Sequence, residues 1–160
     1  MTTDSLNKMD TQRYKKFIEN MEIMAINLKE LKVTDVNLKV DRDALTVTVG
    51  YDDKGYQKNG EELEVFPCFL IEVESDSNKE SAFKIEIQYS VLYHIENLMQ
   101  FGEEYIDIFL NTNVPVNIWP YGREFISSLT TKMGFQPLLI KPMVVNAKIE
   151  PIGDDNALPL

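Results

Sequence analysis

The stretch Trp119–Pro142, WPYGREFISSLTTKMGFQPLLIKP, decides how the rest of the chain is interpreted. Asn117 suits an N-cap, and Pro120 suits the first turn of a helix because its missing N–H has no intrahelical acceptor there. Apolar side chains then recur every four residues, which predicts one buried helical face. They are Tyr121, Phe125, Leu129 and Met133, with Ile126 alongside. Gly134 can end a helix in a left-handed conformation, so we expect the helix to stop at about residue 133.

The segment that follows, residues 135–142, carries Pro137 and Pro142. A proline has no N–H to donate to a neighbouring strand, so this segment cannot be a central strand. We predict an extended apolar strap that lies over the fold. Residues 143–149 suit a short turn of helix, which Pro151 prevents from continuing.

Alternation of apolar and polar residues, the pattern of half-buried strands, fills much of the chain before the main helix. The alternating segments are 26–33, 36–51 with a turn-like break at 41–43, 63–74 and 82–93. Between them, residues 52–62 are polar and are expected to be a connection, and residues 75–79 a turn.

Two further segments have a helical pattern. Apolar residues keep a helical period over about 11–23, and residues 92–110 are expected to form helical pieces that lead to the main helix. Strands followed by helices predict an α+β domain, in which helices pack on one side of an antiparallel sheet.

The composition predicts a single domain. The chain has 160 residues, 44% of them apolar, which is enough for one core. We divide it into a loose N-terminus over 1–10, the domain over 11–149 and a short C-terminal tail over 150–160. No apolar run approaches the length of a membrane span and no leader pattern is present, so we expect a cytoplasmic protein without membrane insertion.

The charge bears on the partners. With 16 basic and 26 acidic residues the net charge is −10, and such a surface repels phosphate backbones. A nucleic-acid ligand is therefore not expected. Basic partners would be attracted, although many acidic proteins use their charge only for solubility.

The residues of enzyme chemistry are scarce. His94 is the only histidine and Cys68 the only cysteine, so neither a catalytic triad nor a multi-cysteine zinc site is available within the chain. The aspartates at 52 and 53 fail the spacing of a calcium loop. We expect no catalysis, no metal and no cofactor.

Aromatic residues along the strands are more often core than ligand site. Tyr51 and Tyr56, however, flank the polar connection, where a core is least needed. Exposed aromatic side chains beside an acidic rim would suit a protein that holds unfolded chains while staying in solution.

The order of residues around the main helix resembles the carboxyl-terminal half of the SecB export-chaperone family. The shared pattern is N-I-aromatic-P-Y-x-R-E-x-I-S-S-hydrophobic, then G-F-x-x-L-x-x-x-P and an N-A pair. It is carried by Asn117, Ile118, Trp119, Pro120, Tyr121, Arg123, Glu124, Ile126, Ser127, Ser128, Leu129, Phe135, Leu138, Pro142, Asn146 and Ala147. The resemblance covers about residues 26–149.

The resemblance implies a four-stranded antiparallel sheet with two helices, assembled as a dimer of dimers, and ATP-independent holding of unfolded preproteins. Tyr121, Phe125 and Leu129 would then serve the oligomer interface as well as the core. Clients would lie in grooves lined by the second strand, the crossover, the fourth strand and the last helix. The positions implied for client binding are Leu45, Val47, Val49, Tyr51, Tyr93 and Ile149.

The resemblance also implies a docking site for the SecA motor on the outer face of the sheet, where Glu30 and Glu86 match two acidic positions. Two other positions differ, since Thr34 replaces an acid and Lys84 replaces an apolar residue. A lysine there would repel a basic partner, which weighs against docking.

Two hypotheses about function follow. The first is a SecB-like holdase that binds unfolded polypeptide, either for export or for one dedicated client such as an antitoxin. The rival is a non-chaperone interaction module on the same fold, with a fixed folded partner. The sequence leaves open the client, the choice between dimer and tetramer, and the role of the helix over 11–23.

Overall fold

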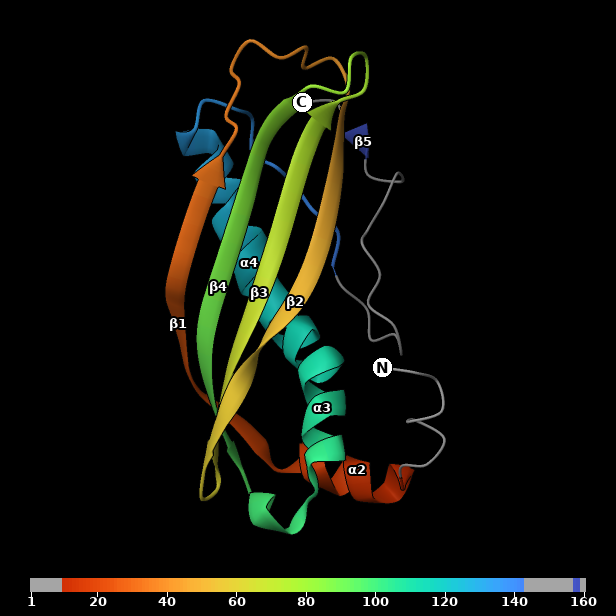
Figure 1. Ribbon diagram of the computed structural model, residues 1–160, viewed down its shortest axis with the longest axis vertical. Helices are drawn as coiled ribbons and strands as arrows, with labels where there is room; N and C mark the ends of the chain where they lie inside the picture. The colour runs from red at the N-terminus through yellow and green to blue at the C-terminus, as the bar shows by residue number, and fades with distance from the viewer. Residues whose placement is uncertain (1–9, 143–156, 159–160) are drawn as a thin grey trace.

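A computed structural model describes residues 10–142 and 157–158 of the chain (Figure 1). Five strands form one sheet in the order β1-β4-β3-β2-β5, and every neighbouring pair is antiparallel. Their bounds are β1 Met21–Thr34, β2 Leu45–Asn59, β3 Glu62–Ser75, β4 Ser81–Ile95 and β5 Ala157–Leu158. The turn predicted over 143–149, the end of the predicted domain and most of the tail lie outside the described residues.

The helices are α2 Thr11–Glu19, η1 Leu98–Gln100, α3 Glu103–Asn111 and α4 Asn113–Lys132. Figure 1 shows α3 and α4 on one side of the sheet and α2 below α3. The predicted α+β architecture, with helices on one side of an antiparallel sheet, is confirmed. Among the described residues, no helix combines the length and the apolar character of a membrane span.

The core lies between the inner face of the sheet and α4. In β4 the side chains of Phe83, Ile85 and Ile87 are buried, while Lys84 between them is exposed, as the alternation predicted. Trp119 of α4 is fully buried, and its ring centroid lies 5.0 Å from that of Phe69 in β3. These aromatic rings fasten the helix to the middle of the sheet.

Gly122 sets how closely α4 approaches the sheet. A Cβ atom at this position would lie 3.3 Å from the Trp119 ring and 3.8 Å from the Phe69 ring. The absence of a side chain therefore lets the helix backbone and the two rings pack together.

The prediction for the start of α4 was wrong, and its buried face differs from the predicted stripe although it shares Ile126 with the prediction. The helix begins at Asn113, so Pro115 occupies the first turn and Pro120 lies inside the helix. Asn117 is not a cap, since its side chain donates to the hydroxyl of Tyr93 at 3.1 Å. The fully buried face consists of Val114, Ile118, Trp119, Gly122, Ile126 and Thr130, not of the stripe that contains Tyr121.

The polar segment 52–62 is not a connection, which corrects a second prediction. It is the far arm of a hairpin, in which β2 runs to Asn59 and pairs with β3 from Glu62. Gly60 has a positive φ of 60° at the tight turn, and the pairing shifts at a bulge between Asp53 and Tyr56. Backbone pairing holds this arm together. Because its side chains are polar, the sequence pattern did not indicate a strand.

Residues 36–40 are not a strand either, because residues 35–44 form turns and irregular structure before β2. Arg42 fixes this segment by donating to the carbonyl oxygens of Leu38 at 3.0 Å and Gly134 at 2.9 Å. Its guanidinium also lies 4.1 Å from the centre of the Phe135 ring. The loop is thereby attached to the end of α4.

The first helix is shorter than predicted and the first strand longer. Asp10 caps α2 by accepting from the backbone N–H of Gln12 at 3.0 Å, and the helix ends at Glu19. Strand β1 already begins at Met21, which pairs with Ile95. Bulges within 23–25 and 28–30 interrupt its alternation, so its apolar spacing imitated a helix.

The strap over residues 135–142 is present as predicted. Hydrogen bonds attach it to α4: Trp119 Nε1 donates to the carbonyl of Lys141 at 2.8 Å, and Arg123 Nε to that of Ile140 at 2.7 Å. The N–H of Leu138 donates to Thr130 Oγ1 at 3.0 Å. These bonds satisfy backbone groups that two prolines prevent from pairing in a sheet.

We predict that Gly122→Val destabilises the protein, because the new side chain would overlap the rings of Trp119 and Phe69. Overpacking of this kind costs about 1–3 kcal/mol. Urea unfolding followed by circular dichroism measures the change. Ser128→Val, at an exposed position of the same helix, controls for placing a β-branched side chain in α4, and equal losses for both variants would contradict the packing account.

Candidate functional site

The residues predicted to bind clients on β2 point into the core. Leu45, Val47 and Val49 have at most 1% of their surface exposed, because they lie on the inner face of the sheet under the helical layer. Their side chains offer no surface to a client in this conformation. Their role in client binding stays a prediction, and it would require either movement of the helices or contact through the β2 backbone.

The side chains of Tyr51 and Tyr93 help to attach the helices to the sheet. The Tyr51 hydroxyl donates to the carbonyl of Leu110 at 2.6 Å, at the end of α3, and the Tyr93 hydroxyl accepts from Asn117. Burial raises the pKa of Tyr93 to about 12, and burial together with nearby Asp53 raises that of Tyr51. Both hydroxyls therefore stay protonated and fasten the junction of α3 and α4 to the sheet. Ile149, the last predicted client position, lies outside the described residues.

The edge of β2 presents main chain instead of side chains. From Leu45 to Tyr51 the strand carries no charge, and β5 pairs only with Leu45 and Thr46. Among the described residues, Val47 to Tyr51 make no backbone hydrogen bond outside the sheet. Unpaired N–H and C=O groups at an uncharged edge are a template for another strand.

The far half of the same edge is protected. Asp52, Asp53 and Lys54 follow directly, and Gly55, with a φ of 100°, lies in the bulge that interrupts pairing. Charges and bulges on an edge strand discourage the addition of a further strand. The open part of β2 is therefore confined to its first half.

At the opposite edge of the sheet, β1 carries an exposed apolar row, which sequence reasoning missed. Ile23, Leu28 and Leu31 are 36%, 46% and 37% exposed. They stand opposite Tyr93, Tyr89 and Ile87, whose side chains are buried, so they point to the helical side of the sheet. We call these three residues the β1 row. Apolar side chains in line on one strand mark a contact surface.

The stripe predicted for the oligomer interface lies on the side of α4 next to its buried face. Tyr121 is 52% exposed, and Phe125 and Leu129 are half-buried against the core. A groove of about 500 Å³ between α4 and the strap lies on another face of the helix, because its α4 lining includes Arg123, Glu124, Ser127, Ser128 and Thr131. The side of α4 that carries Tyr121 is therefore a second apolar surface, separate from this groove.

The two acidic docking positions are close to lysines on the outer face. Glu30 forms an ion pair with Lys32 at 3.1 Å, and Lys32 stands opposite Glu86 in the pairing of β1 with β4. Hydrogen bonding to Glu30 raises the pKa of exposed Lys32. Lys84 forms an ion pair with Asp35 at 3.6 Å. The outer face thus mixes both signs of charge instead of presenting an acidic patch.

Aromatic side chains gather where α2 packs against α3. Phe17 is fully buried, with its ring centroid 5.0 Å from Phe101 and 5.4 Å from Phe109. The Tyr14 ring stacks on that of Tyr105, and its hydroxyl bonds with Asn113. The spacing of Tyr14 and Phe17 marked a buried helical face, but not the partner on which it packs.

The described residues hold little reactive chemistry. They contain no group of three or more His, Cys, Asp and Glu side chains that would hold a metal ion. Burial, with the neighbouring Glu86 carboxylate, raises the pKa of Cys68 to about 11, so its thiol is protonated and a poor nucleophile. The surfaces described above are suited to binding.

Comparison with known proteins agrees with this arrangement. The family profile described as Preprotein translocase subunit SecB matches residues 19–147. The protein-export protein SecB of Acidithiobacillus ferrooxidans is 29% identical over 104 residues, which are 65% of this chain and 68% of that protein. The protein of the same name from Wolbachia sp. subsp. Brugia malayi is 25% identical over 134 residues, 83% of this chain and 80% of that protein.

A solved structure has the same fold. The SecB-like chaperone of Mycobacterium tuberculosis, in complex with a peptide from an antitoxin, superimposes with a TM-score of 0.72 at 15% sequence identity. The match covers 84% of this chain and 99% of that chain. The fold expected from the resemblance is therefore confirmed, and the match of the family profile to residues 19–147 shows that the chain belongs to the SecB family.

Proposed function

We propose that this chain is an ATP-independent chaperone, a holdase that binds extended and mainly apolar segments of unfolded proteins. Membership of the SecB family supports this function. The observation that carries it is the open, uncharged edge of β2 between Val47 and Tyr51. We place the protein in the cytoplasm, where chains await folding or export, and assign it no catalytic activity.

The β2 edge suits clients of many sequences. The β2 side chains that were expected to line a groove are buried, so the strand offers its backbone N–H and C=O groups. Main-chain hydrogen bonds give affinity in strand addition whatever the side chains of the incoming segment. Thr46 and Thr48, half-buried on the outer face, would contact alternate side chains of such a segment.

Two kinds of client fit this proposal. The curated relatives are named for protein export, which favours preproteins. The Mycobacterium tuberculosis chaperone was solved with an antitoxin peptide, which favours a dedicated client. On this proposal either kind of client would present an extended segment, so the same edge would serve both. The rival hypothesis, a fixed folded partner, predicts no activity toward denatured proteins.

We also propose a homo-oligomer with two separate contacts. The β1 row would pair with its counterpart in a second copy, and the α4 surface around Tyr121 would join two such dimers. Each surface is apolar and lies on a different element. Two self-complementary contacts on one chain give a dimer of dimers.

For holdase activity, we predict that the protein at a stoichiometric amount suppresses aggregation of a thermally denaturing reporter enzyme without nucleotide. Thr48→Glu should weaken binding of the denatured enzyme by about threefold to tenfold, because a charge on the β2 edge hinders strand addition. Light scattering measures the suppression. Thr34→Glu, the same change on the β1 edge, is the control. Failure of the unmodified protein to suppress aggregation would favour the rival hypothesis.

For assembly, we predict a tetramer in solution, and a halved mass for Leu28→Lys because the lysine places a charge in the β1 row. Tyr121→Lys should also halve the mass by opening the second contact. Leu38→Lys, at an equally exposed leucine in the loop before β2, should leave the mass unchanged. Native mass spectrometry or light scattering reads the result, and a monomeric unmodified protein would refute the proposed assembly.

For docking on SecA, we propose that the lysines of the outer face weaken binding at Glu30 and Glu86. Lys84→Leu and Lys32→Leu should each tighten binding of SecA, since each removes a positive charge, by about threefold to fivefold for an exposed charge. Lys79→Leu, in the turn between β3 and β4, is the control. Titration calorimetry gives the affinities, and tight binding by the unmodified protein would show that these lysines do not oppose docking.

A further inference from the structure

The carboxyl-terminal segment of the chain occupies the start of the β2 edge. Ala157 and Leu158 form β5 and pair antiparallel with Thr46 and Leu45 (Figure 1). Both residues lie beyond residue 147, where the family profile ends. The pairing is therefore a feature of the extension that this chain carries outside the family match.

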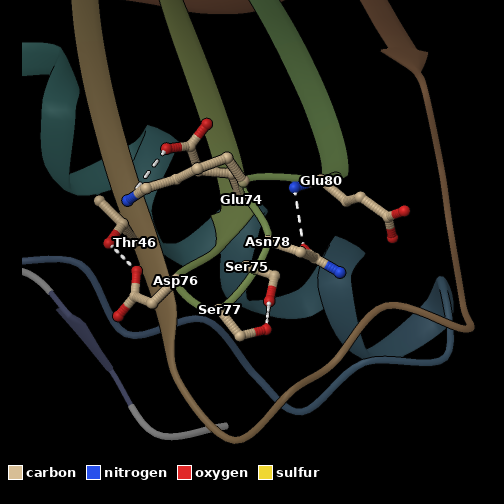
Figure 2. Close-up of polar contacts among 8 residues, drawn as sticks. Thr46, Glu74, Ser75, Asp76, Ser77, Asn78 and Glu80 are labelled. Carbon is tan, nitrogen blue, oxygen red and sulfur yellow. Dashed lines mark hydrogen bonds and ion pairs between the residues drawn. The ribbon is translucent and has the colours of Figure 1, made fainter.

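The start of β2, with which β5 pairs, is held by hydrogen bonds to the turn after β3. Figure 2 shows Thr46 bonded through its hydroxyl to Asp76, in the turn after β3, with β5 beside the same strand. The N–H of Asp76 donates to the carbonyl of Ala44 at 3.1 Å. The edge on which β5 lies is thus preformed, and it continues without charge as far as Tyr51.

We propose that Ala157–Leu158 is a tethered competitor for the client site: it covers the first two positions of the β2 edge and leaves when an extended segment pairs along Leu45–Tyr51. This inference rests on the proposed binding of clients at β2. It adds that the chain itself supplies a strand that a client must displace to pair along the whole of Leu45–Tyr51.

The length of β5 makes it displaceable. It pairs with only two residues of β2, whereas the uncharged edge has room for a strand of seven. Because β5 belongs to the same chain, it competes from a high local concentration. A client that pairs along the whole edge displaces it, while a segment that pairs over two or three residues does not. The tail therefore selects against short segments that would pair at Leu45 and Thr46.

The test uses the full-length chain with one substitution in β5. Ala157→Pro removes one of the two backbone N–H groups of β5 and restricts the preceding residue, so it weakens the pairing of β5 with β2. Asp154→Pro makes the same change outside β5 and is the matched control. Urea unfolding curves establish that both variants are folded.

The probe is a fluorescein-labelled ten-residue peptide of alternating valine and threonine with a lysine at each end. A strand donates to its neighbour through alternate N–H groups, so two further versions carry N-methyl groups on the odd or on the even residues. Fluorescence anisotropy gives the affinity of each version for the three proteins. Loss of binding for one N-methylated version only is expected if the peptide adds as a strand.

We expect Ala157→Pro to tighten binding of the unmethylated peptide by about threefold to tenfold, because the tethered competitor is weakened, with no change for Asp154→Pro. Equal affinities for the unmodified protein and Ala157→Pro would overturn the competitor while leaving client binding at β2 intact. Equally tighter peptide binding by both proline variants would also overturn the competitor, since loss of β5 pairing would not be the cause. Absence of binding by all three proteins would refute both the competitor and the proposed β2 site.

Discussion

Helix α4 packs closely on the sheet because the Trp119 ring contacts the Phe69 ring and Gly122 has no side chain. This packing determines which surfaces of the protein remain for a partner. Because the helix lies so close, the inner side chains of β2 and β4 belong to the core. The hydroxyls of Tyr51 and Tyr93 hold the helical layer in the same position. What is left for binding is the rim and the outer face of the sheet and the outward side of the helix.

The two edges of the sheet differ in the kind of partner they suit. The β1 edge carries charged residues such as Glu22 and Lys32 together with the apolar β1 row, so it suits a partner with a fixed complementary surface. The first half of β2 carries no charge and offers main-chain groups, which suit any extended chain. In the proposed function, assembly would use the β1 edge and clients the β2 edge, where β5 lies.

The sequence predicted the sheet, the strap and the family, because alternation, paired prolines and a specific motif are local signals. It misplaced the face of α4, since Tyr121, Phe125 and Leu129 repeat as regularly as the buried set, and only the fit of Trp119 and Gly122 against Phe69 decides between them. The hairpin arm of β2 was missed because backbone pairing needs no apolar side chain. The β1 row was not predicted because two bulges interrupt the alternation of β1. The open edge of β2 was not predicted because it consists of main chain.

The central claim is that an unfolded chain adds to the sheet through the backbone of β2. Amide hydrogen exchange of the complex with a permanently unfolded protein tests it most directly, because a new strand protects the edge amides with which it pairs. We predict slower exchange within residues 45–51 and unchanged exchange within 23–31 when the oligomer is already formed. Unchanged exchange over 45–51 in a saturated complex would contradict the claim.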